Sequence, residues 1–152
     1  LDGANIGEDM SVLIRCFSFA RSYRHVPEAL YHYVRSNTAS MTALDSKRQI
    51  EMVKRNVDVT TGFIHSRYQN SLERELDFLK LNVKFPLLIS DNTANYEVWN
   101  ACFPEANRSI WKNAKQPFRN KLLQWSALHR HYWIVRGYYR LLFKFVYGIL
   151  YR

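Results

Sequence analysis

The sequence lacks the patterns that mark several common classes of protein. It has only five glycines, and they form no glycine-rich loop of the kind that binds phosphate. It has two cysteines, Cys16 and Cys102, which lie inside apolar helical patterns. We therefore expect reduced, buried thiols in a cytosolic compartment rather than a disulfide framework. No window approaches the roughly eighteen uncharged apolar residues that a simple transmembrane helix needs.

The histidines do not have the spacing of metal ligands. His129 and His131 lie two positions apart in a region with a helical pattern, where their side chains would diverge by roughly 200°. The other three are isolated along the chain: His25, His32 and His65. We therefore predict no metal site in this chain.

Acidic residues are absent from the last 41 residues. Residues 1–111 carry 13 lysines and arginines and 13 acids, whereas residues 112–152 carry nine basic residues and no acid. The whole net charge of +9 therefore belongs to the C-terminal region. Such asymmetry is typical of a segment that meets an anionic surface.

What the chain does contain is enough apolar material for a folded core. Apolar residues make up 47 % of the 152 residues and aromatic residues 15 %, which suits a domain of ordinary size. The first residue is Leu1 rather than Met, and no signal peptide pattern follows it. We expect a fragment of a longer protein.

Apolar periodicity predicts a mainly helical protein with one short β-hairpin, an α+β class. Helices are expected over residues 8–22, 46–68, 71–81, 91–101 and from Pro117 to the C-terminus. Two strands, residues 23–26 and 30–34, are predicted to form a hairpin around Pro27. A lone hairpin is marginal in water, so we expect it to extend a sheet that precedes this chain.

The apolar positions of these helices indicate which faces are buried. In the first helix, Leu13 and Phe17 share the apolar face that we expect to be inward. The expected apolar positions of the helices over residues 46–68 and 91–101 are, respectively, Ile50, Val53, Val57 and Ile64, and Tyr96 and Trp99. The helices of residues 43–116 are interpreted as a packed helical extension, and their charges of alternating sign are expected on solvated faces. The predicted parts are thus residues 1–42, 43–116 and 117–152.

Two acids, Glu8 and Asp9, begin the first predicted helix. Acids are common in a first turn because the helix dipole favours negative charge there. A carboxylate fixed at a helix N-terminus is also ionised and rigidly held, so Asp9 could take a proton from an incoming hydroxyl. Helix chemistry alone leaves both interpretations open.

The surrounding residues add a family resemblance. The ordered elements are Glu8-Asp9, Leu13 and Arg15, Val26-Pro27, and the segment LYHYVRSNTAS over residues 30–40. In this order and spacing, residues 3–42 resemble the C-terminal end of the catalytic domain of family 2 glycosyltransferases. These are inverting enzymes with a GT-A fold. The resemblance implies that this chain is the C-terminal piece of a GT-A domain followed by a helical extension.

The resemblance also implies roles for individual residues. Asp9 corresponds to the catalytic base that deprotonates the acceptor hydroxyl, which then attacks the anomeric carbon of a nucleotide-sugar with inversion. Glu8 corresponds to the neighbouring acid that helps to hold the acceptor. Arg35, Ser36 and Ser40 correspond to a segment near the mouth of the active site, where a donor diphosphate or the acceptor is bound.

The donor site of the family lies outside this chain. It belongs to an upstream nucleotide-binding half, which carries an Asp-x-Asp motif for a divalent metal, magnesium or manganese. The acid-x-acid sequence Glu73-Arg74-Glu75 falls in an amphipathic helical pattern instead. We therefore expect the chain to hold no cofactor and to be inactive alone. Its expected partners are the upstream half, the nucleotide-sugar and a glycan or lipid-linked acceptor.

The C-terminal region has the pattern of a basic amphipathic helix. At about 100° per residue, Arg136, Arg140 and Lys144 line one face with Arg130 beside them, and the opposite face is apolar and aromatic. Three interpretations fit: a helix in the plane of an anionic membrane, a helix docked on the protein's own missing half, and a nucleic-acid binder. The broad apolar face argues against nucleic acid.

Two functional hypotheses follow. The first is sugar transfer in bacterial surface polysaccharide or glycolipid biosynthesis, by a cytoplasmic enzyme that is peripheral at the inner face of the plasma membrane. The second is a non-catalytic membrane-binding or scaffold domain, in which Asp9 is only a helix acid.

Overall fold

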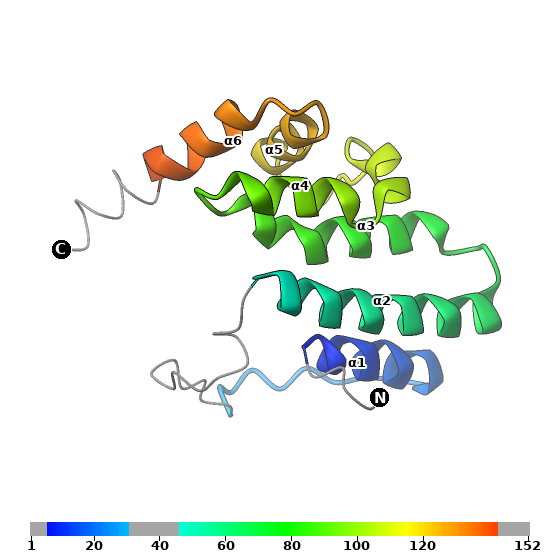
Figure 1. The fold of residues 1–152 in the computed structure, drawn as a ribbon. Helices are drawn as coiled ribbons and strands as arrows, with labels where there is room; N and C mark the ends of the chain where they lie inside the picture. Colours follow the sequence, from blue (N-terminus) through cyan, green and yellow to red (C-terminus); the bar gives the residue numbers. More distant parts are fainter. Residues whose placement is uncertain (1–5, 31–45, 143–152) are drawn as a thin grey trace. The chain divides into compact units, whose positions relative to one another are not determined.

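The structure is a computed structural model that describes residues 6–30 and 46–142, with side chains from residue 48 in the second range. Every regular element in these ranges is a helix, and no strand occurs in them (Figure 1). The prediction of a mainly helical protein is confirmed for this part of the chain. The chain divides into two compact units, residues 1–66 and residues 67–152.

The first unit is built on two helices that lie side by side (Figure 1). Helix α1 spans Glu8–Phe19 and ends before its predicted end at residue 22. Helix α2 spans Ser46–Tyr68, which are its predicted bounds. Three residues of the predicted apolar seam of α2 are buried: Ile50, Val57 and Ile64. The amphipathic pattern therefore identified both the length of α2 and its inner face.

Helix α1 packs with a different face from the predicted one. Leu13 and Phe17 are 54 % and 56 % exposed, while Ser11 is fully buried. The reason lies in α2, whose facing residues Asn56 and Thr60 are polar and also fully buried. Buried polar groups must find hydrogen-bond partners, so the polar side of α1 turns toward them.

The two cysteines differ in their surroundings. Cys102 is buried, as predicted, but Cys16 is exposed, so the prediction of a buried thiol is wrong for Cys16. Cys16 is exposed because it lies on the side of α1 that also carries the exposed side chains of Val12, Leu13 and Phe17.

The predicted hairpin is not formed in the described residues. Residues 23–26 have no regular structure, and the exposed side chains include those of Tyr23, Val26 and Leu30. Beyond Leu30, the second predicted strand lies outside the described residues. A strand must pair its backbone N–H and C=O groups with a neighbouring strand, and no other segment of the described part supplies one.

The second unit contains four α-helices and two short 3₁₀ helices in the described residues. They are α3 (Glu73–Lys84), η2 (Phe85–Leu88), α4 (Thr93–Ala101), η3 (Pro104–Ser109), α5 (Phe118–Leu128) and α6 (Tyr132–Tyr139). Helix α3 packs against η3 and η2, α4 packs against η2, and α5 packs against α6. The largest fully buried side chains of α4 are Tyr96 and Trp99, the two residues that its sequence pattern predicts.

Local residue chemistry sets the ends of α3 and α4. Pro86 lies at the start of η2, directly after α3, where a proline ring cannot continue an α-helix. Asn92 is the N-cap of α4, and its side-chain oxygen accepts a hydrogen bond from the backbone N–H of Ala94 at 3.0 Å.

The C-terminal region is not one helix. Helix α5 ends at Leu128 and α6 begins at Tyr132, so the prediction of a continuous helix from Pro117 is wrong. Between them Arg130 has a φ of 59°, in the left-handed region, and the His131 N–H donates to the Ser126 carbonyl at 2.8 Å. This break lets α6 pack against α5 and α4 and bury Val135. No described helix is long and apolar enough to cross a bilayer.

Candidate functional site

The predicted base lies at the start of α1, directly after a glycine with an unusual backbone. Gly7 is the N-cap of α1 and has a φ of 83°, a region that residues with a side chain rarely adopt. Glu8 and Asp9 follow as the first turn, and both are exposed. Glycine therefore sets the direction in which the two acids enter the helix.

The carboxylate of Asp9 keeps capacity for a ligand. Its Oδ1 accepts a hydrogen bond from the backbone N–H of Met10 at 2.8 Å. That is its one hydrogen bond with the described residues, so Oδ2 has no partner there. An ionised carboxylate with a free oxygen can accept a hydrogen bond and then the proton of a hydroxyl group.

Two contacts with α2 hold the backbone on either side of the acid pair. The Asn56 side-chain amide donates to the Ile6 carbonyl at 2.7 Å, just before Gly7. The hydroxyl groups of Ser11 and Thr60 are hydrogen-bonded at 2.9 Å, just after Asp9. Because all three polar side chains are fully buried, these contacts are protected from water. The structure thus fixes the start of α1 on both sides.

The remaining residues of the predicted transfer site are not brought together with Asp9 in the described part of the structure. Arg35, Ser36 and Ser40 lie outside the described residues, so their roles stay predictions. No three His, Cys, Asp or Glu side chains converge in residues 6–30 and 46–142. Glu75 instead pairs with Arg74 at 3.1 Å. A backbone hydrogen bond and Arg74 hold the pKa of Glu75 below its usual value.

The predicted basic face is partly neutralised within the protein. Arg136 and Arg140 both pair with Asp91, with Nε–Oδ1 distances of 3.8 and 3.0 Å. Arg130 is exposed but lies in the break between α5 and α6, away from the helical face on which we predicted it. Lys144 lies outside the described residues.

The two faces of α6 have different surroundings. On the inner face, Val135 is buried, and Tyr132 packs on Tyr96 with ring centroids 5.4 Å apart. The outer face carries Trp133, which is 76 % exposed, and Leu141, just beyond the end of α6, is 61 % exposed. The apolar face that we expected to meet a membrane or a missing half therefore packs, at least in these residues, inside the second unit.

The prediction that the side chains of His129 and His131 diverge on a helix is wrong. His129 and His131 do not diverge, because the helix stops before them. Their rings lie 6.2 Å apart at 30°, and both lie near Trp125, at 4.6 and 6.0 Å between centroids. They form an aromatic cluster in which the two histidines are exposed and the tryptophan is half-buried.

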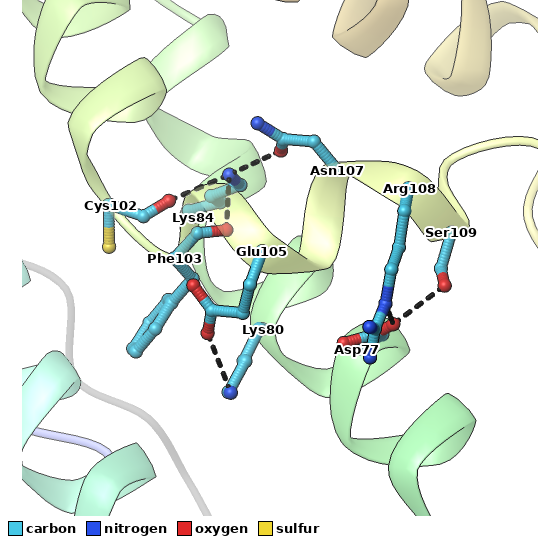
Figure 2. A network of polar contacts seen from close by, with 9 residues as sticks. All are labelled: Asp77, Lys80, Lys84, Cys102, Phe103, Glu105, Asn107, Arg108 and Ser109. Carbon is cyan, nitrogen blue, oxygen red and sulfur yellow. Dashed lines mark hydrogen bonds and ion pairs between the residues drawn. The ribbon is translucent and has the colours of Figure 1, made fainter.

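A buried lysine at the end of α3, in the second unit, was not predicted from the sequence (Figure 2). Lys84 is fully buried, and its Nζ donates to the Cys102 carbonyl and to Asn107 Oδ1, each at 2.7 Å. The same Nζ is 3.3 Å from the Phe103 carbonyl and 4.1 Å from the centroid of the Trp99 ring. Burial lowers the pKa of Lys84 to about 8.

A buried acid on the same helix binds the other end of η3 (Figure 2). Asp77 Oδ2 accepts hydrogen bonds from Arg108 Nε at 3.0 Å and from Ser109 Oγ at 2.7 Å. Between the two buried charges, Lys80 pairs with Glu105 at 2.7 Å. The expectation that charges of the middle helices lie on solvated faces is thus wrong for Asp77 and Lys84. The seven-residue spacing of Asp77 and Lys84 places both on one face of α3, but the helix η3 that binds them was not predicted.

Comparison of the chain with models of protein families, with curated proteins and with solved structures finds no match. The resemblance of residues 3–42 to family 2 glycosyltransferases therefore rests on the order and spacing of the residues themselves.

Proposed function

We propose that this chain is the C-terminal part of an inverting glycosyltransferase of the family 2 type, with Asp9 as its catalytic base. The observation that carries the proposal is the start of α1. An exposed Asp9 with a free oxygen follows a left-handed glycine, in a segment anchored on both sides to α2. These are the properties that a general base requires: access, available lone pairs and a fixed position.

In the proposed reaction, the Asp9 carboxylate removes the proton of an acceptor hydroxyl as its oxygen attacks the anomeric carbon of the donor. The bond between that carbon and the diphosphate oxygen breaks on the opposite side. The nucleoside diphosphate leaves with the bonding electron pair, and the configuration inverts. Glu8, one residue away, holds the acceptor. We place the donor in the upstream half, together with a divalent cation that would neutralise the diphosphate.

The exposed face of α1 supports the presence of such a half. Leu13 and Phe17 are more than half exposed on the helix that carries Asp9, and Tyr23 stacks edge-on against Phe17 at 5.7 Å. Contiguous exposed apolar side chains mark surfaces that other protein elements cover. We propose that the nucleotide-binding half covers this face and so meets Asp9.

The proposal is tested by replacing Asp9 in the polypeptide that includes the upstream half. General-base catalysis contributes about 10²–10⁴-fold, so Asp9→Asn should lower kcat at least about a hundredfold. Asp58→Asn, an exposed acid on α2, is the matched control and should leave kcat unchanged. Near-normal turnover by the Asp9 variant would return the acid pair to the role of a charged first turn.

A second role is favoured by the outer face of α6. We propose that Trp133, Arg140 and Leu141 contact an anionic membrane surface, because exposed aromatic and aliphatic side chains beside a cation suit the bilayer interface. Such contact would hold the enzyme at the inner face of the plasma membrane. If α6 alone carried the function, the chain would be a non-catalytic membrane-binding or scaffold domain.

Sedimentation with vesicles tests the membrane contact. We expect binding to vesicles that contain anionic lipid, a weaker interaction with neutral vesicles, and loss of binding in Trp133→Ala. Trp111→Ala, which removes a half-exposed tryptophan outside α6, is the control. A chain that stays in the supernatant with anionic vesicles at low salt would exclude this role.

A further inference from the structure

A shallow pocket of about 250 Å³ lies where the end of α3 meets the start of α5 in the second unit. Its walls are Asn82, Phe85, Asn113, Lys115, Gln116, Pro117 and Asn120. Four of these seven residues carry a neutral side-chain amide, and none carries a carboxylate. The lining is therefore rich in groups that both donate and accept hydrogen bonds.

A buried glutamine behind the pocket holds part of this wall in place. Gln124 is fully buried, and its side-chain Nε2 donates to Gln116 Oε1 at 3.0 Å and to the Asn120 carbonyl at 3.3 Å. Gln116 Nε2 lies 3.4 Å from Asn82 Oδ1. The chain of amides from Gln124 to Asn82 therefore orients the wall before any ligand arrives.

Several amide atoms of the wall remain available. The Asn120 side chain makes no hydrogen bond with the described residues, and neither do the Nδ2 atoms of Asn82 and Asn113. Asn113 Oδ1 is occupied by the Lys115 backbone N–H at 3.1 Å. The pocket thus combines fixed amides with unused donors and one unused carbonyl, while Phe85 adds an aromatic surface.

The four neutral amides fit a ligand with several hydroxyl groups, and Lys115, the one charged residue of the lining, is exposed to solvent. A hydroxyl both donates and accepts, as a side-chain amide does, and the CH face of a sugar ring can lie on an aromatic or proline surface. The volume lies below the roughly 300–1,000 Å³ of pockets for drug-sized ligands, so one ring is accommodated better than a whole nucleotide-sugar. We propose that this pocket binds one neutral sugar unit of a glycan.

The inference deepens the proposed function and rests on it for the source of the sugar, which would be the acceptor glycan. Binding itself requires neither Asp9 nor a donor. Absence of sugar binding would therefore contradict only the pocket proposal. Normal turnover by Asp9→Asn would contradict only the proposed transfer mechanism.

The test is a titration of the ¹⁵N-labelled chain with glucose, galactose, N-acetylglucosamine and their disaccharides, followed by NMR. We expect the side-chain amide signals of Asn82, Asn113, Gln116 and Asn120 to shift and to saturate with a Kd of roughly millimolar order. Absence of any saturable shift at about ten times that concentration would overturn the proposal. Stronger shifts of the same signals with adenosine or uridine would also overturn it, because amides pair with bases too.

Two variants and one control assign the binding to the pocket. Asn120→Ala and Asn82→Ala should each weaken the Kd about fivefold, the effect of one hydrogen bond. Both positions are at least partly exposed, and the backbone spectrum reports whether each variant is folded. Asn70→Ala removes an exposed amide outside the pocket and should leave the Kd unchanged. Wild-type affinity in both pocket variants would overturn the proposal.

Discussion

At the scale of single residues, Lys84 has the largest consequence for the second unit. The last carbonyls of a helix lack partners within the helix, and Lys84 binds the Cys102 carbonyl just after α4 at 2.7 Å. It also contacts the carbonyl of Phe103, whose φ of 48° is strained for a residue with a side chain. One ammonium group on α3 therefore stabilises the turn that joins α4 to η3.

Replacing this lysine should unfold the protein more easily. Lys84→Met keeps the length of the side chain but leaves buried carbonyls and Asn107 without a donor, so we expect a loss of about 2–4 kcal/mol in the free energy of unfolding. Urea unfolding at pH 7 measures it. Lys54→Met, on the exposed side of α2, is the control and should change stability by less than about 0.5 kcal/mol.

The pH dependence of stability follows from the same burial. The pKa of Lys84 is about 8 in the folded protein, against about 10.4 for an unperturbed lysine. Between these values the unfolded chain binds one more proton than the folded chain, so the contribution of Lys84 rises with pH by up to about 1.4 kcal/mol per pH unit. Below pH 8 the contribution of Lys84 to the free energy of unfolding does not change with pH. Stability profiles of the wild type and Lys84→Met that run parallel from pH 7 to 10 would contradict this.

Gly7 is the residue at which backbone conformation positions the acid pair. Gly7→Ala places a side chain at a φ of 83° and should cost about 1–2 kcal/mol in the free energy of unfolding. Gly62→Ala is the matched control, because nothing lies within 4 Å of the added carbon. Since it lies inside α2, it should stabilise by about 0.5–1 kcal/mol. Chemical denaturation should therefore show that the two variants change the free energy of unfolding in opposite directions. Equal changes would contradict the role of Gly7.

At the scale of elements, the break between α5 and α6 is the feature that most changes the expected function of the tail. The break turns the apolar face of α6 toward α4 and α5, where Val135 is buried and Tyr132 packs on Tyr96. It also places Arg136 and Arg140 beside Asp91. Helix α6 is therefore held within the second unit through its inner face, and among the described residues its outer face is the part that could meet a membrane.

A single substitution distinguishes the broken helix from a continuous one. Arg130 has a left-handed φ of 59°, which glycine adopts without strain, so Arg130→Gly should stabilise the protein by about 1 kcal/mol. In a continuous helix the same change would destabilise by about 1 kcal/mol. The sign of the shift in the urea midpoint decides between the two.

The elements that could be predicted are those with a strong local pattern. The periodicity of α2 gave its bounds and its buried residues Ile50, Val57 and Ile64, and α4 buries Tyr96 and Trp99 as expected. The turn at Arg130 could not be predicted, because neither glycine nor proline marks it. The short helix η3 was missed even though Pro104 begins it.

The candidate site was predictable only in part, for a physical reason. The position of Glu8 and Asp9 in a first turn follows from local sequence and is confirmed. The contacts that anchor this turn join Ile6 to Asn56 and Ser11 to Thr60, about fifty positions apart. Such pairs depend on how two helices pack, which the local periodicity of either helix does not encode.

At the scale of the whole molecule, the two compact units carry different parts of the proposed function. The first unit holds the acid pair at the start of α1, and the second holds the amide-lined pocket and the outer face of α6. Within the described residues, neither unit contains a group of side chains suited to a metal ion. The proposed function places the donor in an upstream half, so the central proposal must be tested in a polypeptide that contains that half.

The most direct test measures sugar transfer and nucleotide-sugar binding together, in the polypeptide that includes the upstream half. If Asp9 is the base, Asp9→Asn should bind the donor with the wild-type Kd while kcat falls at least about a hundredfold. This pattern would place the loss at proton removal from the acceptor rather than at donor binding or folding. Turnover by Asp9→Asn within about twofold of the wild type would contradict the proposal.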